Sequence, residues 1–314
     1  MNFKRTLSKL KNNNPWLKIL WFKRLAKKRS KALQISDREV IEEGYKKVFN
    51  ALPNLEDPKL FFEKLQWLKL YYRNKLMPVV SDKYEVRAYL DNLGYGYLLN
   101  NLLGVWDNLE KFNHNSLPEK FVLKATHASG DAWNLIVKNK KKINWFANKK
   151  VMNQWLHQKI DWLGREWHYG EMKPRIIAEK FLEDNSGELR DYKFHCVDGI
   201  PQFVIICIGR YTDKKIYLTF DKDWTLLPFT NDSKELANEI DIPKPENYEK
   251  MWELASELSK PFPYVRVDFY NVNGKIYFGE FTFFSSSGFE GPYTEEAQKY
   301  MGDAIKLPEQ NNFT

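Results

Sequence analysis

Two stretches near the C-terminus, VRVDFY at residues 265–270 and KIYFGEF at residues 275–281, decide the fold prediction. Both alternate apolar with polar or charged residues, which is the period of a half-buried β-strand. The segment between them, NVNG at residues 271–274, is rich in residue types that favour a tight turn. We therefore predict an antiparallel hairpin.

One face of this hairpin is expected to carry chemistry. Alternation places Arg266 and Asp268 on the same face, and the turn would bring Glu280 beside Asp268. Two neighbouring carboxylates repel unless a cation shares them, and Mg²⁺ is a hard ion that prefers oxygen ligands. A nearby arginine can stabilise negative charge that develops on a transferred phosphoryl or acyl group. The alternative is a solvated face on which Arg266 pairs with one of the acids.

A second candidate site begins at the strand FVLK, residues 121–124, which runs into the small polar loop ATHASG, residues 125–130. A lysine at the end of a strand supplies a point charge for phosphate, and the N–H groups of such a loop can surround phosphate oxygens. Lys124 precedes the loop and no Gly-Lys-Ser/Thr follows it, so this is not a P-loop. The alternative is a lysine that ends a strand only to reach water.

The rest of the chain alternates between helical and strand periods without an internal repeat, which predicts an α+β fold class with interlaced lobes. An Asp198-Gly199 turn is expected to join two of the strands into a hairpin. We expect helices from residue 37, after residue 58, and over residues 81–94, 149–160 and 246–260, and further strands over residues 134–138, 175–182, 191–197, 202–208 and 216–221. The apolar strand at 175–182 ends in charged residues, and its backbone could bind an adenine.

The net charge of +8 is concentrated in the first 36 residues, which contain eleven Lys/Arg and no Asp or Glu. Elsewhere the acidic residues slightly outnumber the basic ones. The two cysteines, Cys196 and Cys207, lie in no metal or redox motif, and no run of about 18 apolar residues occurs. These features favour a cytoplasmic protein.

The basic N-terminal arm, residues 1–31, combines cations with large apolar residues. Five of these could share a broad helix face: Trp16, Leu17, Leu20, Trp21 and Leu25. Such a helix is typical of proteins that bind an anionic membrane, here the inner face of the cell membrane. A helix that packs on the protein itself is the alternative. Nucleic acid is disfavoured as a partner because the arm contains so much aliphatic surface.

The order of these motifs resembles the ATP-grasp superfamily, and most closely its TupA-like branch, which is named for teichuronopeptide synthesis. The resemblance covers roughly residues 78–300. Its motifs are Asp82-Lys83 with Val86-Arg87, His127-Ala128-Ser129-Gly130, Glu179-Lys180-Phe181-Leu182, Asp191-Tyr192-Lys193-Phe194, Arg266-x-Asp268 and Gly279-Glu280-Phe281-Thr282. It implies an α+β ATP-grasp architecture in which two lobes with mixed or antiparallel sheets clasp ATP, preceded by the basic helical region.

The resemblance also implies roles for residues of the nucleotide site. Lys83 and Lys124 would hold the phosphates of ATP, with Lys124 also counted as catalytic. The loop residues Ser129 and Gly130 would lie over the phosphates. The hinge from Glu179 through Lys180, Phe181 and Leu182 would receive adenine, and Glu183 or Glu179 would lie near adenine or ribose. His127 and Lys193 are additional candidates for ATP contacts, with loop packing and a surface cation as their respective alternatives.

For the metal site, the resemblance implies that Asp268 and Glu280 bind Mg²⁺ and that Arg266 stabilises an acyl-phosphate or the tetrahedral intermediate after it. The chain departs from the common ATP-grasp pattern at Thr282, where many members have Asn. A hydroxyl is a poorer ligand than an amide carbonyl, so a second Mg²⁺ would be held less well.

The function implied is an ATP-dependent carboxylate–amine ligase that activates a carboxylate as an acyl-phosphate. Its substrates would be a sugar or amino acid bearing the carboxylate and an amine acceptor, in the synthesis of a cell-surface polysaccharide such as a capsule. The alternatives are an ATP-dependent kinase, a glycosyltransferase that uses Asp221-Lys222-Asp223, and a basic peripheral binding protein with an inactive ATP site. The predicted domains are the basic helical region (1–77), a segment before the ATP-grasp core (78–120), an ATP-binding lobe with phosphate loop and hinge (121–183) and a catalytic lobe with the metal hairpin (184–314).

Overall fold

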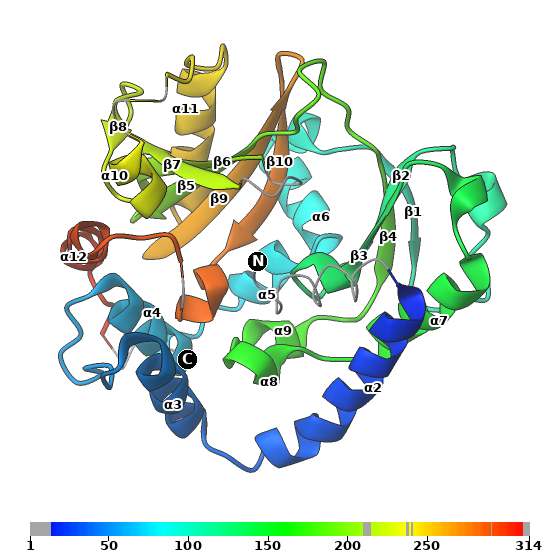
Figure 1. The fold of residues 1–314 in the computed structure, drawn as a ribbon, viewed down its shortest axis with the longest axis horizontal. Helices are drawn as coiled ribbons and strands as arrows, with labels where there is room; N and C mark the ends of the chain where they lie inside the picture. Colours follow the sequence, from blue (N-terminus) through cyan, green and yellow to red (C-terminus); the bar gives the residue numbers. More distant parts are fainter. Residues whose placement is uncertain (1–13, 210–214, 237–238, 240, 290, 310–314) are drawn as a thin grey trace. The chain divides into compact units, whose positions relative to one another are not determined.

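The computed structural model describes residues 14–209, 215–236, 239, 241–289 and 291–309 (Figure 1). The chain forms two compact units. Unit 1 is built from Met1–Ser36 and Leu76–Phe181, and unit 2 from Asp37–Lys75 and Leu182–Thr314. Each unit contains helices and an antiparallel sheet, so the α+β fold class predicted from the sequence is confirmed. The four-part domain division stays a prediction.

Unit 1 contains a four-stranded sheet in the order β1-β4-β2-β3, with every pair antiparallel. Its strands are β1 (Leu102–Trp106), β2 (Phe121–Ala125), β3 (Asn134–Val137) and β4 (Ile176–Lys180). Its helices are α2 (Pro15–Ala32), α5 (Leu76–Ser81), α6 (Glu85–Asn92), α7 (Trp145–His157), α8 (Asp161–Gly164) and α9 (His168–Glu171), with short 3₁₀ turns at Gly96–Leu98, His114–Ser116, Asp131–Trp133 and Lys140–Lys142. In β2, alternate residues Phe121, Leu123 and Ala125 are fully buried, so Lys124 lies on the other face.

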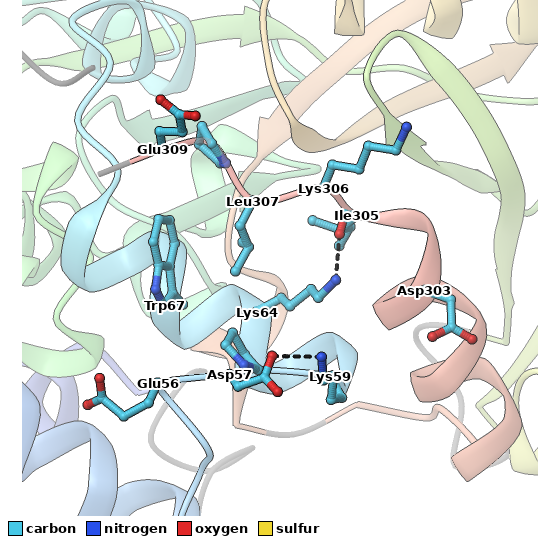
Figure 2. A pocket seen from close by; sticks show the side chains of 12 residues that line it. Glu56, Asp57, Lys59, Lys64, Trp67, Asp303, Ile305, Lys306, Leu307 and Glu309 are labelled. Carbon is cyan, nitrogen blue, oxygen red and sulfur yellow. Dashed lines mark hydrogen bonds and ion pairs between the residues drawn. The ribbon is translucent and has the colours of Figure 1, made fainter. Parts of the chain in front are cut away.

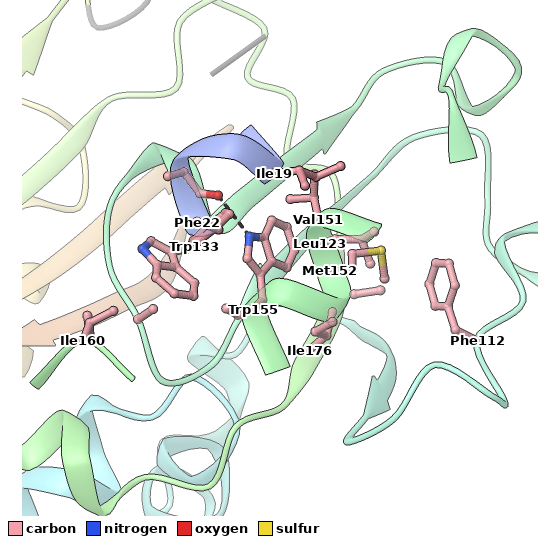
Figure 3. Packing of buried hydrophobic residues seen from close by; sticks show 14 of the residues in the cluster. Ile19, Phe22, Phe112, Leu123, Trp133, Val151, Met152, Trp155, Ile160 and Ile176 are labelled. Carbon is pink, nitrogen blue, oxygen red and sulfur yellow. Dashed lines mark hydrogen bonds between the residues drawn. The ribbon is translucent and has the colours of Figure 1, made fainter. Parts of the chain in front are cut away.

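The core of unit 1 lies between this sheet and helices α2 and α7 (Figure 3). Phe22 of α2 packs edge-on against Trp133, with ring centroids 4.8 Å apart. The indole of Trp155, on α7, donates a hydrogen bond to the Ala132 carbonyl at 3.1 Å. From Pro15 to Ala32 the basic N-terminal region is helical, as predicted, and one face of α2 packs on its own unit through Ile19, Phe22 and Leu25.

Unit 2 contains a six-stranded antiparallel sheet in the order β10-β9-β5-β6-β7-β8. Its strands are β5 (Asp191–Val197), β6 (Ile200–Ile208), β7 (Ile216–Phe220), β8 (Leu226–Leu227), β9 (Tyr264–Val272) and β10 (Lys275–Thr282). Its helices are α3 (Asp37–Phe49), α4 (Phe61–Tyr71), α10 (Asn231–Glu235), α11 (Tyr248–Ser259) and α12 (Glu295–Ala304), with a 3₁₀ segment at Ser285–Gly288. Helix α11 packs on β5, β6 and β9, while α4 packs on α12 and on the segment that follows β10 (Figure 1).

Both predicted hairpins are confirmed. Strands β5 and β6 join across Asp198 and Gly199, whose φ angles of 45° and 78° suit the tight turn. Strands β9 and β10 pair across the segment expected from the sequence. The third predicted helix begins later than expected, at Glu85, because Asp82 Oδ1 accepts hydrogen bonds from the backbone N–H groups of Tyr84 and Glu85.

Helix α7 begins at Trp145, four residues before the predicted start. Asn144 explains the difference, because its side chain accepts a hydrogen bond from the N–H of Ala147 and caps the helix there. Among the described helices, none combines the length and the apolar character needed to cross a bilayer.

Candidate functional site

In unit 2, the β9–β10 hairpin brings together the residues predicted for the metal site. Glu280 lies directly opposite Asp268, and Thr282 lies opposite Arg266. The guanidinium of Arg266 donates from Nε and Nη2 to the two Asp268 oxygens, both at 2.6 Å. Nη2 also donates to Thr282 Oγ1 at 3.0 Å and lies 3.5 Å from Glu280 Oε1. The structure therefore places both acids beside one arginine.

This arrangement depends on a β-bulge at Gly279. Up to Phe278 the register is regular, and one residue is then skipped so that Glu280, not Gly279, opposes Asp268. Without the bulge, Glu280 would point to the opposite face, because side chains alternate along a strand. Glycine fits this close approach, since a Cβ at Gly279 would lie 2.9 Å from the Asp268 carbonyl oxygen.

Lys193 adds a second cation to the same carboxylate. It lies opposite Asp268 on the neighbouring strand β5, and its Nζ donates to Asp268 Oδ2 at 2.8 Å and to Asp191 Oδ2. Burial by itself raises the pKa of Asp268, but the charges of Arg266 and Lys193 outweigh it and lower that pKa from 3.8 to about 2. The ion pair of the alternative interpretation is thus present, but it is buried and not solvated: Asp268 is only 2% exposed.

The residues of this site fit Mg²⁺. Mg²⁺ is commonly held by one or two carboxylates together with substrate phosphates and waters, and Asp268 and Glu280 offer two carboxylates at adjacent positions of paired strands. The Glu280 side chain is 41% exposed and accessible to a ligand. Over the described part of the chain, no group of three or more His, Cys, Asp or Glu is placed to hold a metal ion. A metal ion at this site would therefore take its ligands from the two acids, from the Thr282 hydroxyl and from the substrate of the protein.

Behind Arg266 lies a buried chain of hydrogen bonds that the sequence analysis missed. Arg266 Nη1 donates to Ser285 Oγ at 3.0 Å, and the Tyr293 hydroxyl lies 3.5 Å from the same oxygen. His195 bridges the hydroxyls of Tyr293, 3.2 Å from Nε2, and Tyr264, 3.0 Å from Nδ1. Burial, with the charge of Arg266, holds the pKa of His195 well below 6.5, so its imidazole is neutral. Strand alternation could have indicated that His195 belongs to this network, because it places His195 on the same face of β5 as Lys193.

In unit 1, two of the predicted nucleotide-site residues form an ion pair. Lys124 Nζ donates to Glu179 Oε2 at 2.7 Å, and Arg87 Nη1 donates to Glu179 Oε1 at 3.2 Å. Arg87 also donates from Nη2 to the Asn100 carbonyl at 2.7 Å. Glu179 therefore holds two cations on the face of the sheet opposite the core. Arg87 belongs to a motif of the family resemblance, but no role was predicted for it.

The loop after β2 contains the other candidates for phosphate binding. Lys83 lies against this loop: its backbone N–H donates to the Thr126 carbonyl at 3.2 Å, and its ammonium donates to the Ala128 carbonyl. Ser129 and Gly130 are exposed, and Gly130 has a φ of 87°, which favours glycine. The structure thus gathers Lys83 and the exposed end of the loop in one place.

His127 supports this loop from inside unit 1. Its side chain is fully buried, and Nε2 lies 3.1 Å from the carbonyl oxygens of both Trp155 and Gln158. Nε2 therefore carries the hydrogen and donates to them. Direct contact between His127 and ATP stays a prediction.

The burial of His127 predicts a pH dependence of stability. Burial lowers its pKa from 6.5 to about 4, so between these values the unfolded chain binds a proton that the folded chain does not. Stability is therefore expected to fall as the pH drops below 6.5, by about 2 kcal/mol at pH 5 from this group. In urea unfolding at pH 7 and pH 5, His127→Gln should reduce the loss by about that amount. The exposed His157→Gln serves as control, and an unchanged loss in His127→Gln would contradict the assignment.

The predicted hinge lies where the chain passes from unit 1 to unit 2, between Phe181 and Leu182. The Lys180 backbone N–H donates to the Asn101 carbonyl at 2.9 Å, and its carbonyl accepts from Asn100 Nδ2 at 2.8 Å. In unit 2, the Glu183 carbonyl accepts from Asn273 Nδ2 at 3.1 Å, while the Glu183 side chain is exposed. Adenine and ribose binding by these residues stays a prediction.

A hollow of about 510 Å³ in unit 2 contains none of the predicted site residues (Figure 2). It is lined by α4, by the preceding loop, by the end of α12 and by the segment after α12. Two of its lysines already contact oxygens: Lys64 Nζ lies 2.6 Å from the Ile305 carbonyl and Lys59 Nζ 2.6 Å from Asp57 Oδ1. We assign this hollow no chemistry.

Comparison with known proteins adds a family match. The family described as TupA-like ATPgrasp matches residues 63–306, which is more than half of the chain. No curated protein matches the chain.

Solved structures give weaker similarities. The D-alanine–D-alanine ligase from Bacillus anthracis, complexed with ATP, is 15% identical, with a TM-score of 0.44 over 72% of this chain and 65% of that chain. The corresponding ligase from Helicobacter pylori is 13% identical, with a TM-score of 0.42 over 79% and 69%. The ATP-grasp ligase PsnB, complexed with a minimal precursor, is 12% identical, with a TM-score of 0.40 over 77% and 67%. The chain spans less than two thirds of the first of these ligases.

Proposed function

The chain belongs to the TupA-like ATP-grasp family, and from that premise we propose that it is an ATP-dependent ligase that joins a carboxylate to an amine. The observation that carries the proposal is the pairing of Asp268 with Glu280 across β9 and β10, beside the buried guanidinium of Arg266. Two acids that could hold Mg²⁺ and a guanidinium fixed beside them suit a reaction that binds phosphate groups and then develops negative charge on an oxygen.

In the proposed reaction, a carboxylate oxygen attacks the γ-phosphorus of ATP and ADP leaves, which gives an acyl-phosphate. An amine then attacks the acyl carbon, loses a proton and displaces phosphate to form the amide. Bound Mg²⁺ would neutralise the charge of the phosphates. Asp268 and Glu280 would hold it, and Arg266 would stabilise the oxygen that becomes negative when the amine attacks.

The residues of unit 1 would bind the nucleotide. Lys124 and Lys83 would contact the phosphates, with the exposed Ser129–Gly130 end of the loop over them. The hinge over residues 179–183 would bind adenine through its backbone and the ribose through a carboxylate. In unit 2, Lys193 would orient Asp268, with which it is already paired.

The substrate class is also a proposal. The closest branch of the family resemblance is named for teichuronopeptide synthesis, which supports a role in a cell-surface polysaccharide of the cell envelope, such as a capsule. The carboxylate would then belong to a uronic acid or an amino acid.

One observation weighs against the glycosyltransferase alternative. Asp221 Oδ1 accepts hydrogen bonds from the backbone N–H groups of Asp223, at 2.9 Å, and Thr225, at 2.7 Å. This carboxylate therefore stabilises a turn, as acids at turns commonly do.

The test of the proposed function is product analysis across a panel of uronic acids, amino acids and amines. A ligase is expected to release ADP and phosphate together only when both an acid and an amine are present. A kinase would leave the phosphate on its acceptor, and a glycosyltransferase would ignore ATP. Either result would overturn the proposal.

We further propose that the protein works at the cytoplasmic face of an anionic membrane, through α2. Although α2 packs on unit 1 with one face, Trp16, Leu17 and Leu20 remain 46%, 42% and 53% exposed. Phe146 of α7, 67% exposed, adds to this apolar surface, because its ring centroid lies 6.3 Å from that of Trp16. Leu25, predicted on the same face, is instead buried.

Cations accompany this apolar surface. Lys150 Nζ lies 4.3 Å from the ring centroid of Phe146 and 5.4 Å from that of Trp16. Along α2 the exposed basic residues follow the apolar ones: Lys23, Arg24, Lys27, Lys28 and Lys31. Aromatic and aliphatic side chains beside cations suit the interface of an anionic bilayer. The remaining arm residues, 1–13, lie outside the described part of the chain.

The membrane proposal predicts the effect of two exposed leucines. Leu17→Gln with Leu20→Gln should weaken binding to vesicles of phosphatidylserine and phosphatidylcholine at least about tenfold, since each buried leucine contributes roughly 1.5–3 kcal/mol. Leu93→Gln, another exposed leucine of unit 1, is the matched control. Sedimentation at low and high salt measures both effects, and salt should weaken binding of the unmodified protein. If the double variant binds the vesicles as well as the unmodified protein does, the membrane proposal is wrong. Truncation is a poorer test, because it would also remove Ile19 and Phe22 from the core.

A further inference from the structure

We propose that Lys69, on α4, is a positioning residue for Arg266: it holds a strained loop whose first residue fixes the guanidinium. The proposal rests on the function proposed for the hairpin site, in which Arg266 stabilises developing charge. It concerns contacts within unit 2 only.

The loop after β10 has an unusual backbone. Ser286, Ser287 and Gly288 have consecutive φ angles of 49°, 55° and 67°. Only glycine adopts this left-handed region at little cost, so two serines there represent stored strain. Such strain persists only where surrounding groups hold the backbone in place, and it is common near functional sites.

Two side chains of α4 hold this backbone. Lys69 Nζ donates to the Ser287 carbonyl at 2.6 Å, and Gln66 Nε2 donates to the Gly288 carbonyl at 2.6 Å and to the Ser287 carbonyl at 3.3 Å. Lys69 also donates to Gln66 Oε1 at 2.8 Å, which fixes the amide. Both side chains are buried, with Lys69 only 1% exposed.

The aromatic residue that ends the loop is held as well. Phe289 lies under the Lys69 ammonium, with Nζ 4.4 Å from the ring centroid. On α3, Gly44 leaves room for this ring, since a Cβ there would lie 2.7 Å from Phe289 Cε1. The loop is therefore clamped by α4 and limited in its movement by α3.

The start of the loop reaches the candidate catalytic group. Ser285 Oγ accepts from Arg266 Nη1 at 3.0 Å, while Nε and Nη2 of the same guanidinium bind Asp268. Asp268 thus fixes one edge of the guanidinium and Ser285 fixes the remaining nitrogen. If the loop relaxed to an ordinary backbone, Ser285 would shift and Nη1 would lose this partner. A group that stabilises developing charge loses efficiency when it is displaced by even about 1 Å.

The test compares Lys69→Met with Lys64→Met in the full chain. Lys64 is a matched control because it lies on the same helix and also donates to a backbone carbonyl at 2.6 Å, that of Ile305 outside the loop. The first readout is the NMR signal of the Arg266 Nε–H, assigned with Arg266→Lys. Lys69→Met should shift this signal and speed its hydrogen exchange about tenfold or more, and Lys64→Met should leave it unchanged.

The second readout is turnover with the acid and amine found in the panel. Lys69→Met should lower kcat about tenfold or more with KM for ATP within about threefold, because positioning, not nucleotide binding, is lost. An unchanged Arg266 signal and kcat in Lys69→Met, or equal effects of Lys64→Met, would overturn the proposal.

A smaller change guards against loss of folding. Ser285→Ala removes one hydroxyl and should shift the Arg266 signal in the same direction, and an unaltered signal would again overturn the proposal. If the unmodified protein releases no ADP with any acid and amine, the proposed ligase function fails. The NMR comparison of the variants would still show whether the loop positions Arg266.

Discussion

Glu280→Gln is expected to abolish turnover while the fold stays intact, whereas Asp268→Asn is expected to lose both activity and stability. The difference follows from their surroundings. The Asp268 carboxylate is buried and accepts hydrogen bonds from Arg266 and Lys193, so its loss leaves the buried Arg266 guanidinium and the part-buried Lys193 ammonium poorly compensated. Breaking such a buried pair costs about 3–5 kcal/mol. Glu280 is part-exposed and makes only long contacts, so its change should cost less than about 1 kcal/mol.

Both changes remove a charge that would hold Mg²⁺, so each should lower kcat at least about a hundredfold. Urea unfolding measures stability, and release of ADP measures turnover. Glu246→Gln, an exposed acid near the hairpin turn, is the control for changes in surface charge. If Glu280→Gln keeps near-normal activity, the hairpin acids do not bind a catalytic metal.

Lys124→Met is expected to weaken binding of Mg-ATP about 10- to 100-fold, the loss expected for one hydrogen bond between charged groups. Its effect on stability should be small, about 1 kcal/mol, because Arg87 still pairs with Glu179 after the change. Calorimetric titration measures the affinity, and thermal unfolding without ligand measures the stability.

The matched control is Lys138→Met, an exposed lysine just after β3 in the same unit. It should leave the affinity unchanged. Equal affinity in Lys124→Met and the unmodified protein would mean that the Lys124 charge serves only its ion pair with Glu179.

The hairpin shows how much of the site could be predicted from the sequence. Alternation and the turn segment predicted β9 and β10 correctly, and also the position of Glu280 beside Asp268. That adjacency, however, depends on the bulge at Gly279, which shifts the register by one residue. The bulge reflects a close backbone approach that no local pattern in the sequence reveals.

Contacts between distant segments were harder to predict. A helix was expected after residue 58, but nothing in the sequence indicated that its Lys69 and Gln66 would be buried against a loop more than two hundred residues later. In the same way, the apolar residues of α2 were predicted to share one face. The structure divides them, because Leu25 packs on the core of unit 1 while Trp16 and Leu20 stay exposed. Tertiary packing decides which side chains of a helix are buried, and periodicity alone does not specify that packing.

The most direct test of the central claim, activation of a carboxylate by phosphorylation, follows oxygen from the acid to the phosphate. With the acid labelled by ¹⁸O in both carboxylate oxygens, turnover with ATP and amine should give phosphate that carries one ¹⁸O and an amide that keeps the other. This result requires that a carboxylate oxygen attacked phosphorus. Phosphate without ¹⁸O, formed together with the coupled product, would show that the carboxylate is not activated as an acyl-phosphate and would contradict the proposed mechanism.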